Sequence, residues 1–341
     1  MGKEIVRLKT IKVKFIGFWE SFDPDEYSFF QAMKRNYHVE VCEDADYLLC
    51  SIWGVKYDYC HYPQVRIMFS GENYIPDFNL VDYAISPYPL QLLDRHFYLP
   101  NCIDKYHHCE ALETRKRAYG REFLSSKEYF ANFIASHESE DNCRGDFFKR
   151  LNRYKRVESA GSYLNNMPDG KTVDFTNSSK TDFQRKCKFT LCFESTKHEG
   201  FITEKITDAF FAETIPVYYG SDTVKDIFNP KAFVNCSDYL DFDAVVERII
   251  ELDQDDDKYL AMMNEPIFAE GFSPASVLRD EEAFVRNIFD QPLEHAYRRS
   301  RVFWPQRFND FLCEAKLPGN IPMGELVQAM KARVKNRLGL K

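Results

Sequence analysis

No stretch of the 341 residues approaches the roughly 18 consecutive apolar residues that a transmembrane helix needs. The first fifteen residues, MGKEIVRLKTIKVKF, carry charges throughout, so the apolar core of a signal peptide is missing as well. Met1 and Gly2 are not followed by the Ser or Thr at position 6 that a myristoylation signal requires. From these absences we expect a cytoplasmic protein without a membrane-spanning anchor.

The sequence also lacks an excess of positive charge and a paired-cysteine motif. Its 45 Lys and Arg are outnumbered by 53 Asp and Glu, and the net charge of −8 argues against a nucleic-acid partner. None of the ten cysteines form a C-x-x-C pair, so no zinc site is indicated. We expect reduced thiols, with Cys187 and Cys192 buried.

Length and composition predict two domains with aromatic-rich cores. The chain is 44% hydrophobic and 29% charged, which is the balance of a globular protein, and it contains 30 Phe and 20 Tyr. The first part is predicted to run strand 11–19, helix 27–35, then strands 37–41, 47–53, 65–69 and 81–85. Strands separated by helix-length connections favour a parallel sheet with crossover helices.

A second series of the same kind begins near Tyr129. It is predicted as strand 130–135, helix 144–151, a short strand near 157, strand 188–193, helix 204–212, strand 215–219 and helix 242–252. The joint between the two series, residues 105–128, reads as loop-rich. We therefore expect one α/β domain over 1–128, a second over 129–290 and a helical tail over 291–341.

The last residues, 323–341, have a different pattern. Leu326, Met330, Val334 and Leu338 recur at four-residue steps with Lys and Arg between and beyond them, which predicts a basic amphipathic helix. Such a helix either packs on the body of the protein by its apolar face or adsorbs reversibly to an anionic membrane surface.

A charged segment, FESTKHEGFITEK, occupies residues 193–205 between a predicted strand and a predicted helix. Strand-to-helix junctions of this kind bind ligands in open α/β sheets. Thr203 is placed to cap the helix, Lys205 adds a mobile charge at its N-terminus, and Gly200 permits close backbone approach. Glu204 can accept hydrogen bonds from sugar hydroxyls. This pattern predicts a phosphate or diphosphate site, although T-E-K is also a good helix start without any ligand.

Residues 188–235 resemble the donor-binding motif of the α1,3/1,4-fucosyltransferases, glycosyltransferase family 10, in their shorter bacterial form. The family pattern K-F-x-L-x-F-E-N, Y-x-T-E-K, P-V/I-x-x-G-S/P and F-x-P is matched in register from Lys188 to Pro230. Upstream, Phe69 to Asn73 (FSGEN) and Pro76 to Ala84 look like the bacterial F-T-G-E-N and P-x-F-N…D-Y-A segment. A weaker match includes Arg144.

The resemblance implies a fold of GT-B type, with two Rossmann-like α/β domains facing across a cleft. It implies inverting transfer of L-fucose from GDP-L-fucose to the 3-hydroxyl, in some members the 4-hydroxyl, of N-acetylglucosamine in a β-galactoside glycan. The domain over 1–128 would bind the acceptor and that over 129–290 the donor. Glu72 matches the family's proposed catalytic base, and Glu204 would bind the nucleotide ribose or the fucose.

The resemblance also assigns the donor site. Lys205 and the helix start would take the place of a metal, so a divalent cation is at most stimulatory. Asp241-Phe242-Asp243 fits a D-x-D pattern but is expected to cap a helix, and residues 253–257 are expected to be solvated. The remaining residues expected at the donor are Glu194, Ser195, Phe201, Thr203 and Asn165.

Four positions depart from the family pattern, and one of them is His137, which stands where many relatives have Asn. Ser195 replaces the usual Asn, Phe201 replaces a Tyr, and Leu164 stands where some relatives carry a phosphate-binding Arg. The diphosphate contact would then come from Arg144 or Arg156. His198 is expected to be a solvated loop residue.

The acceptor and the choice between the 3- and 4-hydroxyl stay open at this point. Candidates for stacking on sugar faces are Trp53, Tyr57, Tyr59, Tyr88 and Phe97. Two other functions also stay open: a GT-B transferase with another nucleotide sugar or acceptor, and a non-catalytic glycan- or nucleotide-binding protein. The tail would suit an enzyme that fucosylates lipid-linked glycans at the inner face of a bacterial membrane.

Overall fold

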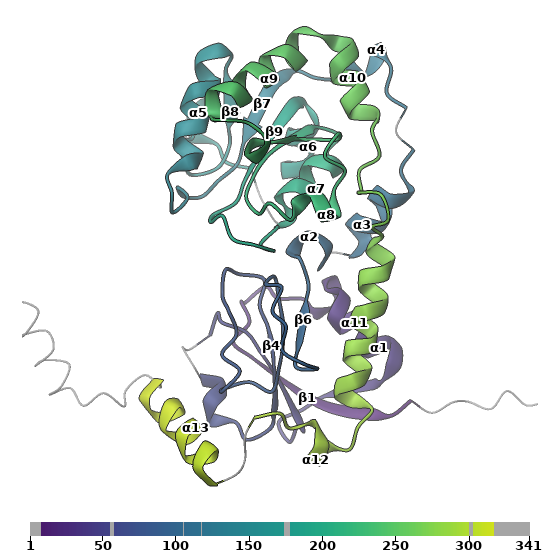
Figure 1. Ribbon diagram of the computed structural model, residues 1–341, viewed down its shortest axis with the longest axis vertical. Helices are drawn as coiled ribbons and strands as arrows, with labels where there is room; N and C mark the ends of the chain where they lie inside the picture. Colours follow the sequence, from purple (N-terminus) through teal and green to yellow (C-terminus); the bar gives the residue numbers. More distant parts are fainter. Residues whose placement is uncertain are drawn as a thin grey trace, which may run out of the picture.

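The structure is a computed structural model that describes residues 8–54, 58–104, 106–116, 118–173, 178–299 and 303–316. It has two α/β lobes, one above the other in Figure 1. This confirms the expected arrangement of two Rossmann-like domains. The predicted amphipathic segment 323–341 lies outside the described residues. No helix within the described residues is long and apolar enough to cross a membrane.

The first lobe is built on a six-stranded parallel sheet of order β2-β1-β3-β4-β5-β6. Its elements are β1 (Thr10–Ile16), α1 (Ser28–Asn36), β2 (His38–Val41), β3 (Tyr47–Cys50), β4 (Val65–Phe69), β5 (Tyr83–Ser86) and β6 (His96–Tyr98). Strands β3, β4 and β5 are buried along their whole length, as their largely apolar sequences predict. Short 3₁₀ turns lie at Pro24–Glu26 and Asp58–His61.

The second lobe carries a five-stranded parallel sheet of order β11-β10-β9-β7-β8. Its strands are β7 (Tyr129–Phe133), β8 (Val157–Ser159), β9 (Cys187–Phe193), β10 (Ile215–Tyr219) and β11 (Val234–Asn235). Its helices are α5 (Cys143–Tyr154), α6 (Ser179–Arg185), α7 (Glu204–Phe211), α8 (Val224–Ile227), α9 (Phe242–Gln254) and α10 (Asp256–Asn264). Cys187 and Cys192 are fully buried, and all ten cysteines are free thiols, as expected.

The connection between the lobes is helical, so the prediction of a loop-rich joint was wrong. It contains α3 (Tyr106–Thr114) and α4 (Arg121–Leu124), preceded by α2 (Asn101–Asp104). The chain then returns from α10 to the first lobe through α11 (Pro274–Phe289) and α12 (Leu293–Ala296), and α13 (Phe303–Lys316) follows. Helix α11 packs along α1 because Phe284, Val285 and Ile288 complete the first core.

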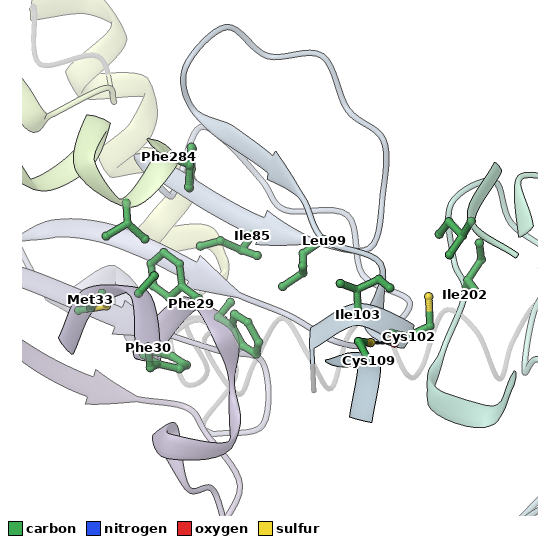
Figure 2. Close-up of a cluster of buried hydrophobic side chains, with 14 of the residues drawn as sticks. Phe29, Phe30, Met33, Ile85, Leu99, Cys102, Ile103, Cys109, Ile202 and Phe284 are labelled. Atoms are coloured by element: carbon green, nitrogen blue, oxygen red, sulfur yellow. Dashed lines mark hydrogen bonds between the residues drawn. The ribbon is translucent and has the colours of Figure 1, made fainter. Parts of the chain in front are cut away.

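One apolar cluster continues from the first lobe into the second (Figure 2). Phe29, Ile85 and Leu99 belong to the first core, and Ile103 of α2 extends it towards Ile202, which precedes α7. The Cys102 backbone N–H donates to the Ile202 carbonyl at 3.0 Å. Helix α2 therefore fixes the position of the charged junction of the second lobe relative to the first sheet.

Candidate active site

The strand orders place one topological switch point in each sheet, and ligands of open parallel sheets bind outside such points. In the first sheet it lies between β1 and β3, whose carboxyl ends lead to Gly17 and Ser51. In the second sheet it lies between β7 and β9, whose carboxyl ends lead to Ile134 and Glu194. The charged segment 193–205 therefore begins at the switch point of the second sheet, in the strand-to-helix junction that was predicted to bind a ligand.

Glu194 is the buried anchor of this junction. Its carboxylate accepts hydrogen bonds from the Thr203 backbone N–H at 2.8 Å and from the Thr203 hydroxyl, and it forms an ion pair with Lys205 at 3.1 Å. Thr203 occupies the N-cap position of α7, but its side chain binds Glu194 and Lys205 and does not cap the helix, so the predicted capping bond was wrong. Lys205 is held on two sides and is not the mobile charge we expected.

Arg144 lies at the second switch point. It stands on the first turn of α5, is 4% exposed, and donates through Nε and Nη2 to the Phe193 carbonyl and through Nη1 to the His137 carbonyl. Among the described residues no carboxylate lies within ion-pair distance of its guanidinium. Burial lowers the pKa of Arg144, which reflects the cost of a desolvated charge that Glu194 and Glu138 offset only from a distance.

Glu72 faces this junction from the other lobe. It lies on the turn after β4, and the Asn101 side chain of α2 donates to the neighbouring Gly71 carbonyl. Burial between the lobes raises the pKa of Glu72, Lys205 lowers it, Glu204 raises it and His137 lowers it. Three of these four influences come from the second lobe, so the cleft brings the predicted base and the predicted donor helix together.

A pocket of about 860 Å³ opens beside Glu72. The first lobe lines it with residues that follow β1, β3 and β4, and the second lobe lines it with α6 and α7. On its second-lobe wall Lys180 of α6 forms an ion pair with Asp208 at 2.6 Å, one turn after Glu204 on α7. A concave site of this size, lined by both lobes and containing a carboxylate of raised pKa, is the default place for substrate.

Three of these residues were not predicted. Asp208 lies four residues after Glu204 and therefore on the same face of α7, a spacing that could have revealed it. Lys180 and Asn101 gave no usable signal, because their roles depend on neighbours far away in the sequence.

Other predicted site residues have local roles in this structure. Both N–H groups of the Asn165 amide donate to backbone carbonyls of its own loop, and Arg156 pairs with Glu158 at 2.8 Å. Phe201 is 2% exposed, so its ring packs inside the protein and offers no open face. Ser195 is partly buried next to Glu194 and accepts the Glu140 backbone N–H at its carbonyl. His198 is exposed in its loop, as expected.

The acidic segments also differ in part from expectation. Asp241 caps α9 by accepting the Ala244 N–H at 2.9 Å, as predicted for the D-x-D pattern. Asp253 is not solvated, because it binds Lys188 and Lys155. In the described ranges no group of three or more His, Cys, Asp or Glu is arranged to hold a metal ion.

Of the aromatic residues considered for the acceptor that the structure describes, Trp53 alone lines the pocket. Tyr59 and Tyr88 are buried in the first lobe, and Phe97 stacks on Phe284. Tyr57 lies outside the described residues.

Comparison with known proteins gives consistent matches in sequence and in structure. Residues 13–104 match the model of the alpha-(1,3)-fucosyltransferase FucT N-terminal domain, and residues 124–264 match that of the glycosyltransferase family 10 (fucosyltransferase) C-terminal region. The alpha-(1,3)-fucosyltransferase FucT of Helicobacter pylori is 32% identical over 252 residues, 65% of this chain and 50% of that protein. The chain thus spans about half the length of this curated relative.

Solved structures agree with the sequence matches. A crystal structure of an alpha1,3-fucosyltransferase with GDP-fucose superimposes with a TM-score of 0.66 at 27% identity, over 84% of this chain and 94% of that one. A second alpha1,3-fucosyltransferase structure gives a TM-score of 0.69 at 25% identity, over 89% and 95%. With both lobes matched by models of one family, the chain belongs to glycosyltransferase family 10, the fucosyltransferases.

Proposed function

We propose that the protein transfers L-fucose from GDP-L-fucose to the 3-hydroxyl of N-acetylglucosamine in a β-galactoside glycan, with inversion at the anomeric carbon. The observation that carries this proposal is the pocket that Glu72 of the first lobe shares with Glu204 of the second lobe, with the charge of Lys205 close enough to lower the pKa of Glu72. An inverting transfer needs a base on one side of the sugar and a site for the leaving diphosphate on the other. Two lobes that contribute these groups separately meet this requirement.

Glu72 is the proposed base. The acceptor oxygen attacks the anomeric carbon of fucose, its proton passes to the Glu72 carboxylate, and GDP leaves with the bonding electrons. The burial that raises the pKa of Glu72 makes the carboxylate a better proton acceptor than an exposed one. Lys205 opposes this effect, because its positive charge lowers the pKa of Glu72 and favours the ionised carboxylate.

The diphosphate is proposed to bind near Arg144 and the N-terminus of α7. Because Glu194 already neutralises part of the Lys205 charge, Lys205 alone is a weak counter-ion for a leaving diphosphate. Arg144 is buried close by without an ion-pair partner among the described residues, so an anion would add to the partial compensation that Glu194 and Glu138 give from a distance. The aligned backbone N–H groups at the start of α7 add a fixed positive potential.

The remaining proposed roles also divide between a donor side in the second lobe and an acceptor side in the first. Glu204 is proposed to bind hydroxyls of the ribose or the fucose, with Ser195 and Thr203 nearby, and a divalent cation is proposed to be at most stimulatory. The first lobe would hold the acceptor and the second the donor.

Contact of 323–341 with an anionic membrane stays a prediction. Co-sedimentation of full-length and 1–322 protein with anionic liposomes at low salt tests it, and equal behaviour of the two would exclude it.

The proposed activity is tested with purified protein and a panel of GDP- and UDP-sugars, using N-acetyllactosamine as acceptor. We expect GDP release and a fucosylated product with GDP-fucose alone, and linkage analysis by NMR should place fucose on the 3-hydroxyl of N-acetylglucosamine. EDTA should leave substantial activity. Turnover with another nucleotide sugar would assign a different transferase. Binding of GDP-fucose without turnover on any glycan would indicate a non-catalytic binder.

A further inference from the structure

Two tryptophans meet at the switch point of the first sheet. Trp19 follows β1 and Trp53 follows β3, and their ring centroids lie 6.4 Å apart in an edge-to-face arrangement. The Trp53 backbone N–H donates to the Gly17 carbonyl at 2.8 Å, which continues the β1–β3 hydrogen bonding beyond both strands. Both side chains were predicted on strands, but each strand ends before its tryptophan.

Two glycines allow this approach. Gly17 has a φ of +73°, and a Cβ there would collide with the Ser51 carbonyl. A Cβ on Gly54 would lie 2.7 Å from the Gly17 Cα. The loops after β1 and β3 can therefore pack backbone against backbone, and this packing brings the two indoles to the same corner of the pocket.

The two rings differ in how they are held. Trp19 is partly buried and contacts Phe22 and Tyr27, with ring centroids 4.8 Å and 6.0 Å away. Trp53 is 55% exposed, although a large aromatic side chain is costly to leave in water. Trp19 forms a fixed floor, and Trp53 forms an outer wall with open ring surface.

Both indoles line the same pocket as Glu72. We propose that Trp19 and Trp53 form the acceptor platform, on which the apolar face of a pyranose ring stacks while the hydroxyl of the neighbouring sugar reaches Glu72. This inference rests on the proposed function and names the group that selects the acceptor. An apolar aromatic wall next to a few polar groups is the usual construction of a site for an uncharged organic ligand.

The charges of the pocket restrict the acceptor further. Its lining includes five carboxylates and two cations, and both cations are engaged, Lys180 with Asp208 and Arg185 with Asp182. A glycan that carries its own carboxylate on the stacked sugar would meet an excess of negative charge. The platform therefore fits a neutral saccharide, and a sialylated acceptor should bind more weakly.

The kinetic test uses Trp53→Ala in the full-length protein. Loss of the stacked ring should raise the KM for N-acetyllactosamine about tenfold or more, with a smaller change in kcat and unchanged GDP affinity. Trp53→Phe, which keeps an aromatic face, should restore most of the loss. Trp304→Ala is the matched control, because Trp304 is 71% exposed on α13 and does not line the pocket.

A binding test is independent of turnover. The sequence has three tryptophans, so in Trp304→Phe protein all indole emission comes from Trp19 and Trp53. Titration with N-acetyllactosamine in the presence of GDP should change this emission saturably, and the sialylated acceptor should require a higher concentration.

The two proposals fail in different ways. If the wild-type protein transfers fucose but Trp53→Ala keeps its acceptor KM, the platform is wrong and the proposed function stands. An unchanged indole emission at saturating acceptor would overturn the platform as well. Equal affinity for neutral and sialylated acceptors would overturn the charge selection. Absence of transfer by the wild type to any acceptor would contradict the proposed function itself.

Discussion

The Lys205 ammonium lies 3.1 Å from Glu194 Oε2 and 2.8 Å from Thr203 Oγ1, and the Glu194 side chain is fully buried. The charge at the start of α7 is thus held in place before any ligand arrives. A cation fixed in this way loses little side-chain freedom when a phosphate binds, but it shares its charge with Glu194. This pair accounts for two of the charges at the junction, those of Glu194 and Lys205.

Removal of Lys205 should affect both stability and donor binding. Lys205→Ala leaves the buried Glu194 carboxylate without its cation, which should lower the free energy of unfolding by about 2 kcal/mol. GDP affinity should also fall, measured by calorimetry well below the melting temperature. In Glu194→Gln/Lys205→Ala the stability should largely return while GDP binding stays weak. Normal GDP affinity in either variant would remove Lys205 from the donor site.

Arg144 is predicted to be the stronger diphosphate contact. Arg144→Met should weaken GDP binding about tenfold or more, because a charge-assisted contact in a desolvated site is lost. Arg150 lies on the same helix but is paired with Asp146 and Asp243 at the surface, so Arg150→Met serves as control and should bind GDP normally. Equal affinities of the two variants would contradict the assignment.

The acidic limb of the pH profile should report Glu72. Since burial raises the pKa of Glu72, kcat/KM should fall as the pH drops through a value above the ordinary pKa of a glutamate. Lys205 lowers the pKa of Glu72, so Lys205→Met should move this limb to higher pH. Glu204 raises it, so Glu204→Gln should move the limb to lower pH. A limb that stays in place in both variants would show that another group is titrating.

Glu281 predicts a pH dependence of stability away from the cleft. It is buried on α11, binds the Ser28 hydroxyl at 3.0 Å, and burial raises its pKa to about 8. The folded protein keeps this carboxyl protonated, whereas the unfolded chain ionises it above its ordinary pKa. Stability should therefore decline by a few kcal/mol as the pH rises from about 5 to 8.

Glu281→Gln should remove most of this decline, because its amide cannot ionise and can still accept the Ser28 hydrogen bond. Urea unfolding at pH 5, 6.5 and 8 measures the free energy of unfolding of the wild-type protein and of the variant. Parallel pH curves for wild type and variant would show that Glu281 does not titrate in this range.

The elements that could be predicted from the sequence are those in which one signal dominates. The strands over 65–69 and 215–219 match β4 and β10 to the residue, because they are buried, largely apolar runs with clear ends. The strands before Trp19 and Trp53 were predicted too long, since apolar residues continue into the loops and Gly17 ends β1 by its left-handed conformation. In these loops the apolar residues line a pocket, which periodicity does not distinguish from a strand.

The site could be predicted in outline but not in its electrostatics. Glu72, Glu204 and Lys205 are recognisable by motif, and in the structure Glu72 and Glu204 line one pocket while Lys205 influences the pKa of Glu72. The Glu194–Lys205 pair, the buried Arg144 and the Lys180–Asp208 pair depend on contacts between distant segments. The role of Asp253 could not be predicted for the same reason. It belongs to an acidic run that was expected to be solvated, but it forms ion pairs with Lys188 and Lys155.

The central claim is that Glu72 takes the proton of the acceptor hydroxyl across the cleft. The most direct measurement is the kcat of Glu72→Gln with saturating GDP-fucose and N-acetyllactosamine, with Glu43→Gln, an exposed carboxylate paired with Lys14 on the first lobe, as control. The account predicts a loss of about 10²-fold or more in kcat, unchanged GDP affinity, and normal activity of the control. A kcat close to that of the wild-type protein in Glu72→Gln would contradict it.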